Sequence, residues 1–399
     1  MKTQSAAQTD NFGGKTPSAL GFRGHISELD GLRAVAVILV LFAHFGPQCR
    51  AGSLLWKIES VGWTGVDLFF VLSGFLITGI LLDSRESRSY YQRFYVRRSL
   101  RILPLYYFVL LASVLILLVW HVGSAKHNLW EASWYLVYLG NARSAFTGHM
   151  PDVAPLGPLW SLQIEEQFYL IFPYLVRSVK PASLGRMLLG VVLLSGPLRW
   201  LLYWWNPHWV IVQYVASPCR LDGLALGGLI ALRARMGPWR LRPAYVAWVA
   251  VGLSGALCVY LIWGGYDWSS GRIRTFGYSM VALAFASVLL WVLTYRGAWQ
   301  TAWLRLRPLQ YLGRISYGIY LLQVPGYLLV GRIFAHFGKR LVTGESWHAA
   351  TWLGFGAVGV CTVALASLSW YVLERPFLRA KNRFIRSVEP IRGGDAGTT

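Results

Sequence analysis

Two side chains that can do chemistry, Arg33 and His44, lie on the first apolar segment of the chain. They are eleven positions apart, close to three helical turns, so a helix would place both on one face, about 16 Å apart along its axis. Ionisable residues inside membrane segments are costly to bury and usually functional. The spacing predicts a site that binds an anion near one membrane surface and uses the imidazole for proton chemistry farther inside.

The fourth apolar segment carries two acids, Glu165 and Glu166. If successive segments cross in opposite directions, His44 and Glu165 reach a similar depth, and a carboxylate beside an imidazole is a general-base pair. Glu165 lies four positions after Ser161 and four before Tyr169, so the three share one helical face. Glu166 points about 100° away and is interpreted as structural. The alternative is that His44 donates to a backbone carbonyl and the acid pairs with an arginine.

Three arginines, Arg97, Arg98 and Arg101, cluster just before the third apolar segment. Spacings of three and four bring guanidinium groups together on a helix, and each guanidinium can bind a phosphate through two hydrogen bonds. The alternative is a plain positive anchor at the inner membrane surface. Together with Arg33 on the same side, the cluster favours a long phosphorylated co-substrate of the shape of a coenzyme A thioester.

Asp67, Arg220 and Asp222 are weaker candidates for the acceptor side of the site. Asp67 needs a partner in an apolar segment, and Arg33 and Arg220 are the two options. Arg220 and Asp222 lie where a later segment begins, so Arg220 could bind an acceptor or neutralise a glutamate. Structural ion pairing explains all three equally well.

These residues must be positioned by membrane helices. The chain of 399 residues is 55% hydrophobic and 14% charged, which is too apolar for an ordinary soluble domain. Crossing a bilayer takes about 20 apolar residues, and lipid leaves helices as the only solution for such segments. We therefore predict an all-α, polytopic bundle of about ten transmembrane helices. The segments are 30–47, 62–82, 102–122, 159–176, 187–205, 219–233, 244–263, 275–295, 309–331 and 350–373.

The remaining stretches surround one membrane domain, expected at 26–380. An apolar stretch at 129–141 is too short to span comfortably and is interpreted as interfacial or re-entrant. A polar tail at 1–25 and a basic, Gly-rich, disordered tail at 381–399 complete the chain. Lysine and arginine concentrate in alternate loops, which predicts cytoplasmic termini; a bacterial cytoplasmic (inner) membrane location is what the family resemblance given below implies.

The net charge of +21 does not indicate nucleic acid, because the charges are scattered in short loops. Positive-inside topology and attraction to membrane lipids explain it better. The four cysteines show no CxxC and no metal-ligand spacing, so no metal is expected. A Cys49–Cys219 disulfide stays open as an alternative, and buried free thiols are favoured.

Seven segments, in this order, resemble the acyltransferase-three family of integral membrane O-acyltransferases. They are LDGLRAVAVILVLFAHF, GVDLFFVLSGFLIT, RRSLRILPLYY, PLWSLQIEEQFYLIFP, RLDGLALGGLIA, ISYGIYLLQVP and YVLERP. The resemblance covers roughly residues 26–380 and is to the stand-alone form without an appended hydrolase-like domain. It implies transfer of an acyl group, commonly acetyl from acetyl-CoA, to a hydroxyl of an extracytoplasmic or lipid-linked glycan. No tightly bound cofactor is expected, and acyl-CoA is the co-substrate.

The resemblance also implies roles for individual residues. His44 matches the family's essential histidine and Arg33 its partner arginine; Arg98 and Arg101 match a pair implicated in cofactor handling, and Glu165 the acid of the Ser-x-x-x-Glu element. Many relatives carry histidine before the x-Pro of the ninth segment, where this chain has Gln323, which cannot carry a proton. Two alternatives stay open: O-acylation of a small acceptor such as a macrolide, and a non-enzymatic lipid or glycan transporter with a polar path.

Overall fold

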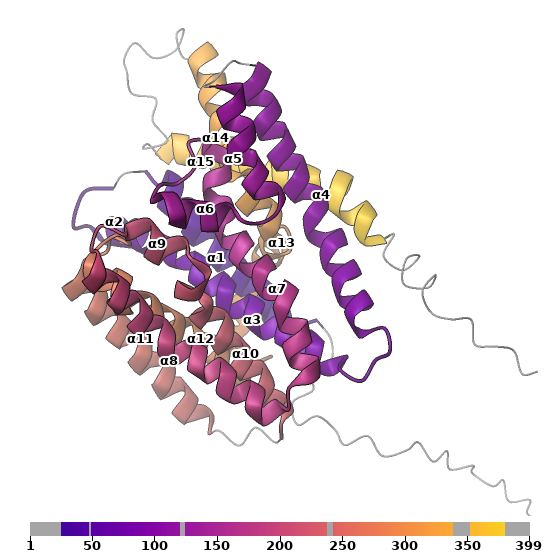
Figure 1. The fold of residues 1–399 in the computed structure, drawn as a ribbon. Helices are drawn as coiled ribbons and strands as arrows, with labels where there is room; N and C mark the ends of the chain where they lie inside the picture. The colour runs from indigo at the N-terminus through magenta and orange to yellow at the C-terminus, as the bar shows by residue number, and fades with distance from the viewer. Residues whose placement is uncertain (1–24, 48, 120–123, 238–241, 338–351, 380–399) are drawn as a thin grey trace, which may run out of the picture.

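The computed structural model describes residues 25–47, 49–119, 124–237, 242–337 and 352–379, in which every regular element is helical. The expected tails at 1–25 and 381–399 lie outside these ranges apart from residue 25. Figure 1 shows the arrangement of the helices. The longer helices are α1 (Ser27–Phe45), α3 (Gly65–Asp83), α4 (Tyr90–Val119), α7 (Trp160–Ser178), α8 (Pro181–Trp205), α10 (Leu221–Arg235), α11 (Pro243–Gly264), α12 (Tyr278–Thr294), α14 (Ser316–Phe337) and α15 (Trp352–Ser369).

Each of the ten predicted spans corresponds to one of these helices. Of the described residues, seven helical segments are both long and apolar enough to cross a membrane. Helices α1 and α7 each carry three acidic or basic residues within 19, and α10 has only 15 residues. The seven segments are Leu54–Asp83, Tyr90–Ile116, Pro181–Trp205, Pro243–Gly264, Ile273–Thr294, Ser316–His336 and Trp352–Arg379. The polytopic helical fold is confirmed.

Shorter helices depart from the predicted boundaries. The stretch expected at 129–141 is two helices, α5 (Ala125–Leu136) and α6 (Gly140–Thr147). The chain turns between them at Tyr138, whose φ of 58° is uncommon for a residue with a side chain. The start of the predicted ninth span is a separate helix, α13 (Arg307–Arg314). The remaining short helices are α2 (Leu54–Val61) and α9 (Val210–Val215).

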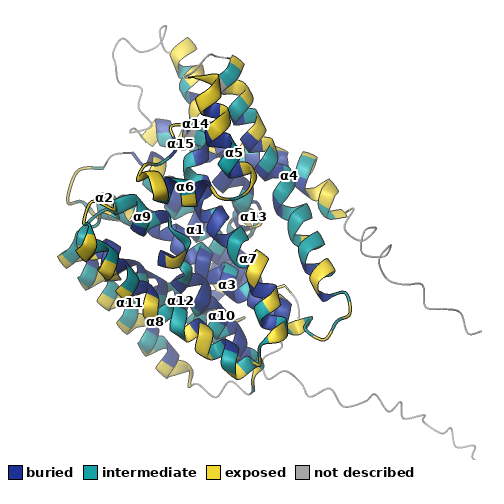
Figure 2. Cartoon of the chain, in the orientation of Figure 1, coloured by how far each residue is buried: buried dark blue, intermediate teal, exposed yellow. Residues whose placement is uncertain are grey.

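Helices α1, α3 and α10 form the buried centre of the bundle, drawn in dark blue in Figure 2. Glycine makes the close approach of α3 and α10 possible, because a Cβ on Gly227 would overlap the backbone of Val71, and one on Gly74 would overlap the backbone of Leu224. Helices α8 and α11 lie on the outside and leave large apolar side chains exposed, such as Trp248 at 74%. Such a surface suits contact with lipid.

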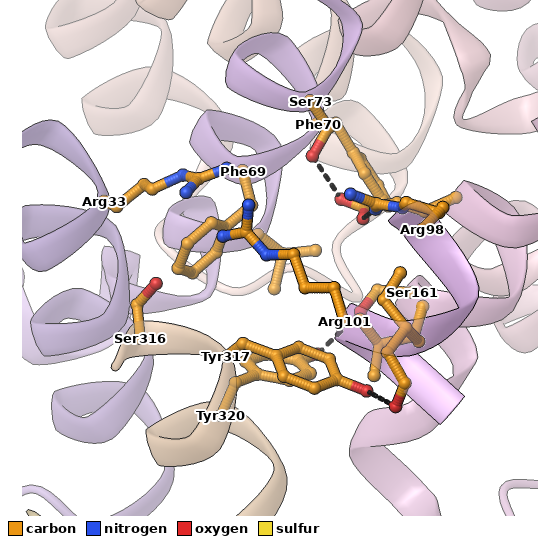
Figure 3. A pocket seen from close by; sticks show the side chains of 14 residues that line it. Arg33, Phe69, Phe70, Ser73, Arg98, Arg101, Ser161, Ser316, Tyr317 and Tyr320 are labelled. Atoms are coloured by element: carbon orange, nitrogen blue, oxygen red, sulfur yellow. Dashed lines mark hydrogen bonds and ion pairs between the residues drawn. The ribbon is translucent and has the colours of Figure 1, made fainter. Parts of the chain in front are cut away.

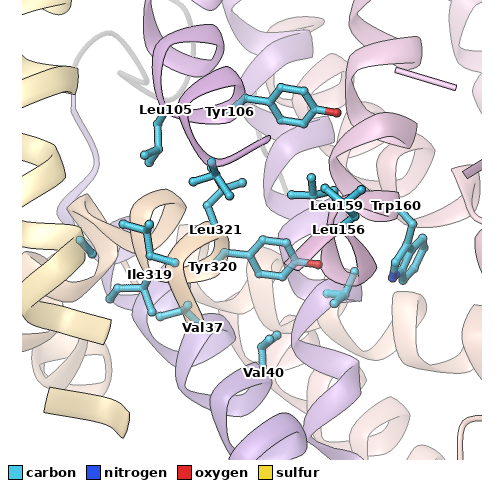
Figure 4. Close-up of a cluster of buried hydrophobic side chains, with 14 of the residues drawn as sticks. Val37, Val40, Leu105, Tyr106, Leu156, Leu159, Trp160, Ile319, Tyr320 and Leu321 are labelled. Carbon is cyan, nitrogen blue, oxygen red and sulfur yellow. The ribbon is translucent and has the colours of Figure 1, made fainter. Parts of the chain in front are cut away.

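The largest apolar cluster joins α1, α4, α7 and α14, as Figure 4 shows. Val37 and Val40 of α1 meet Leu105 of α4 and Ile319 of α14 in it. These four helices and α3 also carry the polar residues of the candidate site, so the packing of this cluster fixes their relative positions. The four cysteines are free thiols, and the Cys49–Cys219 disulfide is not formed; Cys219 is the buried one.

Candidate active site

A cavity with about 660 Å³ of empty space, part of it open to solvent, lies between α1, α3, α4, α7 and α14. Figure 3 shows Arg33 and Arg101 extending into it from two different helices. Its wall combines cations, one acid, hydroxyls and apolar side chains. The lining residues are Arg33, Val66, Phe69, Phe70, Ser73, Arg98, Arg101, Ile102, Ser161, Leu162, Glu165, Ser316, Tyr317 and Tyr320.

Arg33 and Arg101 are half-buried, and neither forms a hydrogen bond or an ion pair with any residue that the structure describes. Burying a cation without a partner is unfavourable, so natural proteins rarely leave one in this state without a reason. Two guanidinium groups that point into one cavity without protein acceptors supply many free N–H donors. Because a guanidinium group can donate two hydrogen bonds to a phosphate or carboxylate, the pair can bind an anion.

Arg98 is held differently from Arg33 and Arg101. Its guanidinium lies 3.5 Å from Glu165, 3.6 Å from Glu166 and 3.9 Å from the centre of the Tyr169 ring. Two carboxylates and an aromatic face compensate its charge and fix its position. Glu166, interpreted from the sequence as structural, is thus a partner of Arg98. The arginine is therefore positioned by the protein before any ligand arrives.

A second cavity, with about 1090 Å³ of empty space, adjoins the first at the arginines. Arg33, Ser73, Arg98 and Arg101 line both cavities. The second cavity extends to the first residues of α1 and to the ends of α3 and α10, where Arg235 donates to both oxygens of Asp83 at 2.7 and 2.8 Å. The arginine cluster therefore lies between a wide opening at one end of the bundle and the central cavity.

Glu165 lies at the depth of Arg33 rather than of His44. It accepts hydrogen bonds from Ser73 at 2.8 Å and from Tyr169 at 2.9 Å, and it pairs with Arg98. The predicted His44–Glu165 general-base pair is wrong. Ser161 and Glu165, in the first two turns of α7, line the same cavity as Arg33, Arg98 and Arg101, so the start of α7 lies beside the arginines.

His44 takes its partner from α14 instead. Its Nδ1 lies 3.1 Å from Oε1 of Gln323, and its side chain is exposed although most neighbouring residues of α1 are not. His44 does not line the central cavity. Gln323 connects the two, because its Nε2 donates to the carbonyl of Tyr320, and the Tyr320 ring lines the cavity. The hydroxyls of Tyr320 and Ser161 are 2.7 Å apart on the cavity wall.

The remaining predicted residues lie away from the cavity. Arg97 is exposed on α4 and does not join Arg98 and Arg101. Asp67 pairs with Arg220 at 2.9 Å rather than with Arg33, and both are buried. Asp222 is 3.1 Å from Arg199. These two buried ion pairs hold α3, α8 and α10 together.

Arg199 was not singled out from the sequence. It is fully buried, donates to the carbonyls of Thr275 and Cys219 and to Asp222, and lies near Ser279 at 2.6 Å. An arginine within the apolar segment of α8 requires a buried partner, and that signal could have found it. The guanidinium of Arg220 lies 4.0 Å from the centre of the Tyr278 ring. The aromatic neighbours and the carboxylates give this region a structural character.

Comparisons with known proteins place this geometry in context. Residues 26–371 match a family described as the acyltransferase domain. The chain is 28% identical over 385 residues to the peptidoglycan O-acetyltransferase OatA of Listeria monocytogenes, covering 91% of this chain and 57% of that protein. It is 28% identical over 378 residues to the putative peptidoglycan O-acetyltransferase YrhL of Bacillus subtilis, covering 88% and 55%. A putative O-acetyltransferase of Staphylococcus aureus is 26% identical over 371 residues, covering 88% and 57%.

The chain thus spans little more than half the length of these relatives. No solved structure matches it.

Proposed function

Because the chain belongs to the acyltransferase domain family, we propose that it is a membrane O-acyltransferase that moves an acyl group from acyl-CoA to a carbohydrate hydroxyl. One observation carries the proposal. Arg33 and Arg101, which have no ion-pair partner among the described residues, present their guanidinium groups where a wide outer cavity meets a narrower central one. A site that neutralised its own charge would suit neither a phosphate nor any other anion.

The donor end of the site suits the phosphates of coenzyme A. Arg33 and Arg101 would bind them bidentately, and Arg98, already fixed by Glu165 and Glu166, would add a third positive charge. The wide cavity has room for the nucleotide, and the central cavity has apolar walls for the pantetheine arm. By the positive-inside rule, this opening faces the cytoplasm, where acyl-CoA is made.

The reacting end lies toward His44. Its imidazole would remove the proton of an acceptor hydroxyl, whose oxygen then attacks the thioester carbonyl. The new ester C–O bond forms, the C–S bond breaks, and the imidazolium returns its proton to the leaving thiolate. An acyl-histidine relay achieves the same balance in two steps. Glu165 acts here through Arg98 and not through the imidazole.

The acceptor is proposed to be a glycan hydroxyl outside the cytoplasmic membrane of a bacterium. Acetyl is the favoured acyl group, since the relatives with 26–28% identity are named O-acetyltransferases, two of them for peptidoglycan. His44 is exposed at the end of α1 opposite to the wide cavity, which suits an acceptor that arrives from the other side of the membrane.

The test measures free coenzyme A released by the full chain in detergent, with acetyl-CoA as donor and soluble peptidoglycan fragments as acceptor. We expect release that depends on acceptor and an acetylated product by mass spectrometry. His44→Ala should lower kcat by about 100-fold or more while the protein still inserts and unfolds at the same temperature. Acetylation of a macrolide but not of the glycan would favour a small acceptor. No turnover with any acceptor would overturn the enzymatic proposal and favour transport.

A further inference from the structure

The amide of Gln323 has one orientation that its surroundings allow. The residue is fully buried, and its Nε2 donates to the backbone carbonyl of Tyr320 at 3.0 Å. Reversing the amide would put two carbonyl oxygens against each other, and neither can donate. The Oε1 atom is therefore the one that faces Nδ1 of His44, at 3.1 Å.

This orientation decides where the imidazole proton lies. An amide oxygen only accepts, so Nδ1 of His44 must carry the hydrogen, and a neutral imidazole then holds its lone pair on Nε2. Within the described part of the chain, Nε2 has no side-chain hydrogen-bond partner, the backbone of Val40 one turn earlier being the other group in hydrogen-bond contact with the ring, and the His44 side chain is exposed. We infer that Gln323 is a positioning residue that fixes His44 in the Nδ1–H tautomer and leaves Nε2 free as the proton acceptor.

The apolar surroundings of His44 and Gln323 explain why the partner of the imidazole is an amide and not a carboxylate. The Phe45 ring stacks on Tyr327 at 5.1 Å beside His44, and Phe42 contacts Phe355 one turn away. A carboxylate in such apolar surroundings would carry a large desolvation penalty. An amide fixes the tautomer without a charge, and its second hydrogen bond to Tyr320 prevents it from rotating. The inference deepens the proposed function and rests on it only for the catalytic consequence.

The tautomer can be measured without any assumption about activity. Nitrogen-15 NMR of the full chain, labelled at histidine and held at a pH where the ring is neutral, distinguishes protonated from unprotonated ring nitrogens. The His44 signal is assigned by its loss in His44→Asn. We expect a protonated Nδ1 and an unprotonated Nε2 in the wild type, and a mixture of tautomers in Gln323→Met, which keeps the side-chain volume but removes the acceptor. A protonated Nε2 in the wild type would overturn the inference.

Gln167→Met is the matched control. Gln167, on α7, is also a glutamine inside the bundle whose Nε2 donates to a backbone carbonyl, that of Tyr138 at 2.8 Å, but it does not contact His44. Its loss should leave the His44 signal unchanged. An equal change of that signal in both variants would mean general loosening of the bundle and would overturn the inference. If Gln323→Met fails to fold, the wild-type tautomer still decides the outcome.

Activity then separates the inference from the proposed function. In Gln323→Met we expect kcat to fall by about 10- to 100-fold, the range known for partners that orient metal-bound histidines, with the KM for acetyl-CoA unchanged. Gln323→Glu should recover most of the loss, because a protonated carboxyl donates to Tyr320 and still accepts from Nδ1. If the wild type shows no turnover, the proposed function is contradicted, whereas the tautomer measured by NMR still tests the inference about Gln323. Wild-type turnover with an unaltered kcat in Gln323→Met would sink the positioning role alone.

Discussion

Two groups of arginines in the interior of this molecule, one fully buried and one half-buried, differ in how their charge is compensated. Arg199 and Arg220 each pair with a buried aspartate, at 3.1 and 2.9 Å. Arg33 and Arg101 point into a cavity without an acceptor from the described protein. The first group joins α3, α8 and α10, whereas the second is the pair proposed above to bind the phosphates of acyl-CoA.

The difference matters because moving any arginine side chain out of water is unfavourable unless a partner compensates its charge. Removing a charge from water carries a penalty of several kcal/mol, which only a close partner repays. A chain that pairs Arg199 and Arg220 so closely could also have paired Arg33 and Arg101. Glu165 lines the same cavity as the three arginines, yet it forms an ion pair with Arg98 alone. The lack of a carboxylate partner for Arg33 and Arg101 is therefore a feature of the central cavity and does not result from a shortage of nearby acids.

The largest effect should come from breaking a compensated pair. Arg220→Met leaves Asp67 buried without its cation, and we expect the protein to lose about 3–5 kcal/mol of stability. The double variant Arg220→Met with Asp67→Leu should regain most of it, because the charge left behind is also removed. Thermal unfolding in detergent measures both. If Arg220→Met is as stable as the wild type, the pairing of Arg220 with Asp67 does not stabilise the protein, and the two groups of arginines do not differ as described.

An intermediate effect is expected at Arg33 and Arg101, and it should appear in substrate binding and not in stability. Arg33→Ala and Arg101→Ala should leave the unfolding temperature unchanged or raise it, since each removes a half-buried charge without an ion-pair partner among the described residues. The KM for acyl-CoA should rise by about 10- to 100-fold, which corresponds to about 1.5–3 kcal/mol for a hydrogen bond between charged groups. Steady-state kinetics with varied acyl-CoA at saturating acceptor measures this.

Arg97→Ala is the matched control for that experiment, because Arg97 is next to Arg98 in the sequence but exposed and outside both cavities. It carries the same charge on the same helix, so a general electrostatic effect on acyl-CoA would appear in it as well. An equal rise of KM in all three variants would mean that the cavity does not bind the phosphates.

Which of these contacts the sequence could predict depends on how far apart the two residues lie along the chain. The cluster of Arg98 and Arg101 follows from their spacing of three on one helix, and Arg33 joins them because topology puts it on the same side. The partner of His44 is 279 positions away, on a helix whose rotation and neighbours no local pattern determines. The pairing of His44 with Glu165 was predicted from membrane depth alone, and it is wrong because the first turns of α7 lie beside Arg33 and Arg98.

The same limit explains Arg199. A lone arginine in an apolar segment predicts that a buried partner exists, but Asp222 lies on the next long helix and is 23 positions away. Composition and periodicity identify which residues are costly to bury, whereas tertiary packing decides which of them meet. For this reason the ten helices and the arginine cluster were accessible from the sequence, and the assignment of pairs was not.

The smallest effect should come from the exposed pair at the opening of the wide cavity, where Asp83 is 46% exposed and Arg235 is 17% exposed. A solvent-exposed ion pair contributes about 0–1 kcal/mol and is screened by salt. Asp83→Asn should therefore leave stability nearly unchanged. It also frees the Arg235 guanidinium and makes the opening more positive, so the KM for acyl-CoA should fall slightly at low salt and return to the wild-type value at high salt. A large change of stability, or a change of KM that salt does not reduce, would show that this pair belongs with the compensated group in the interior.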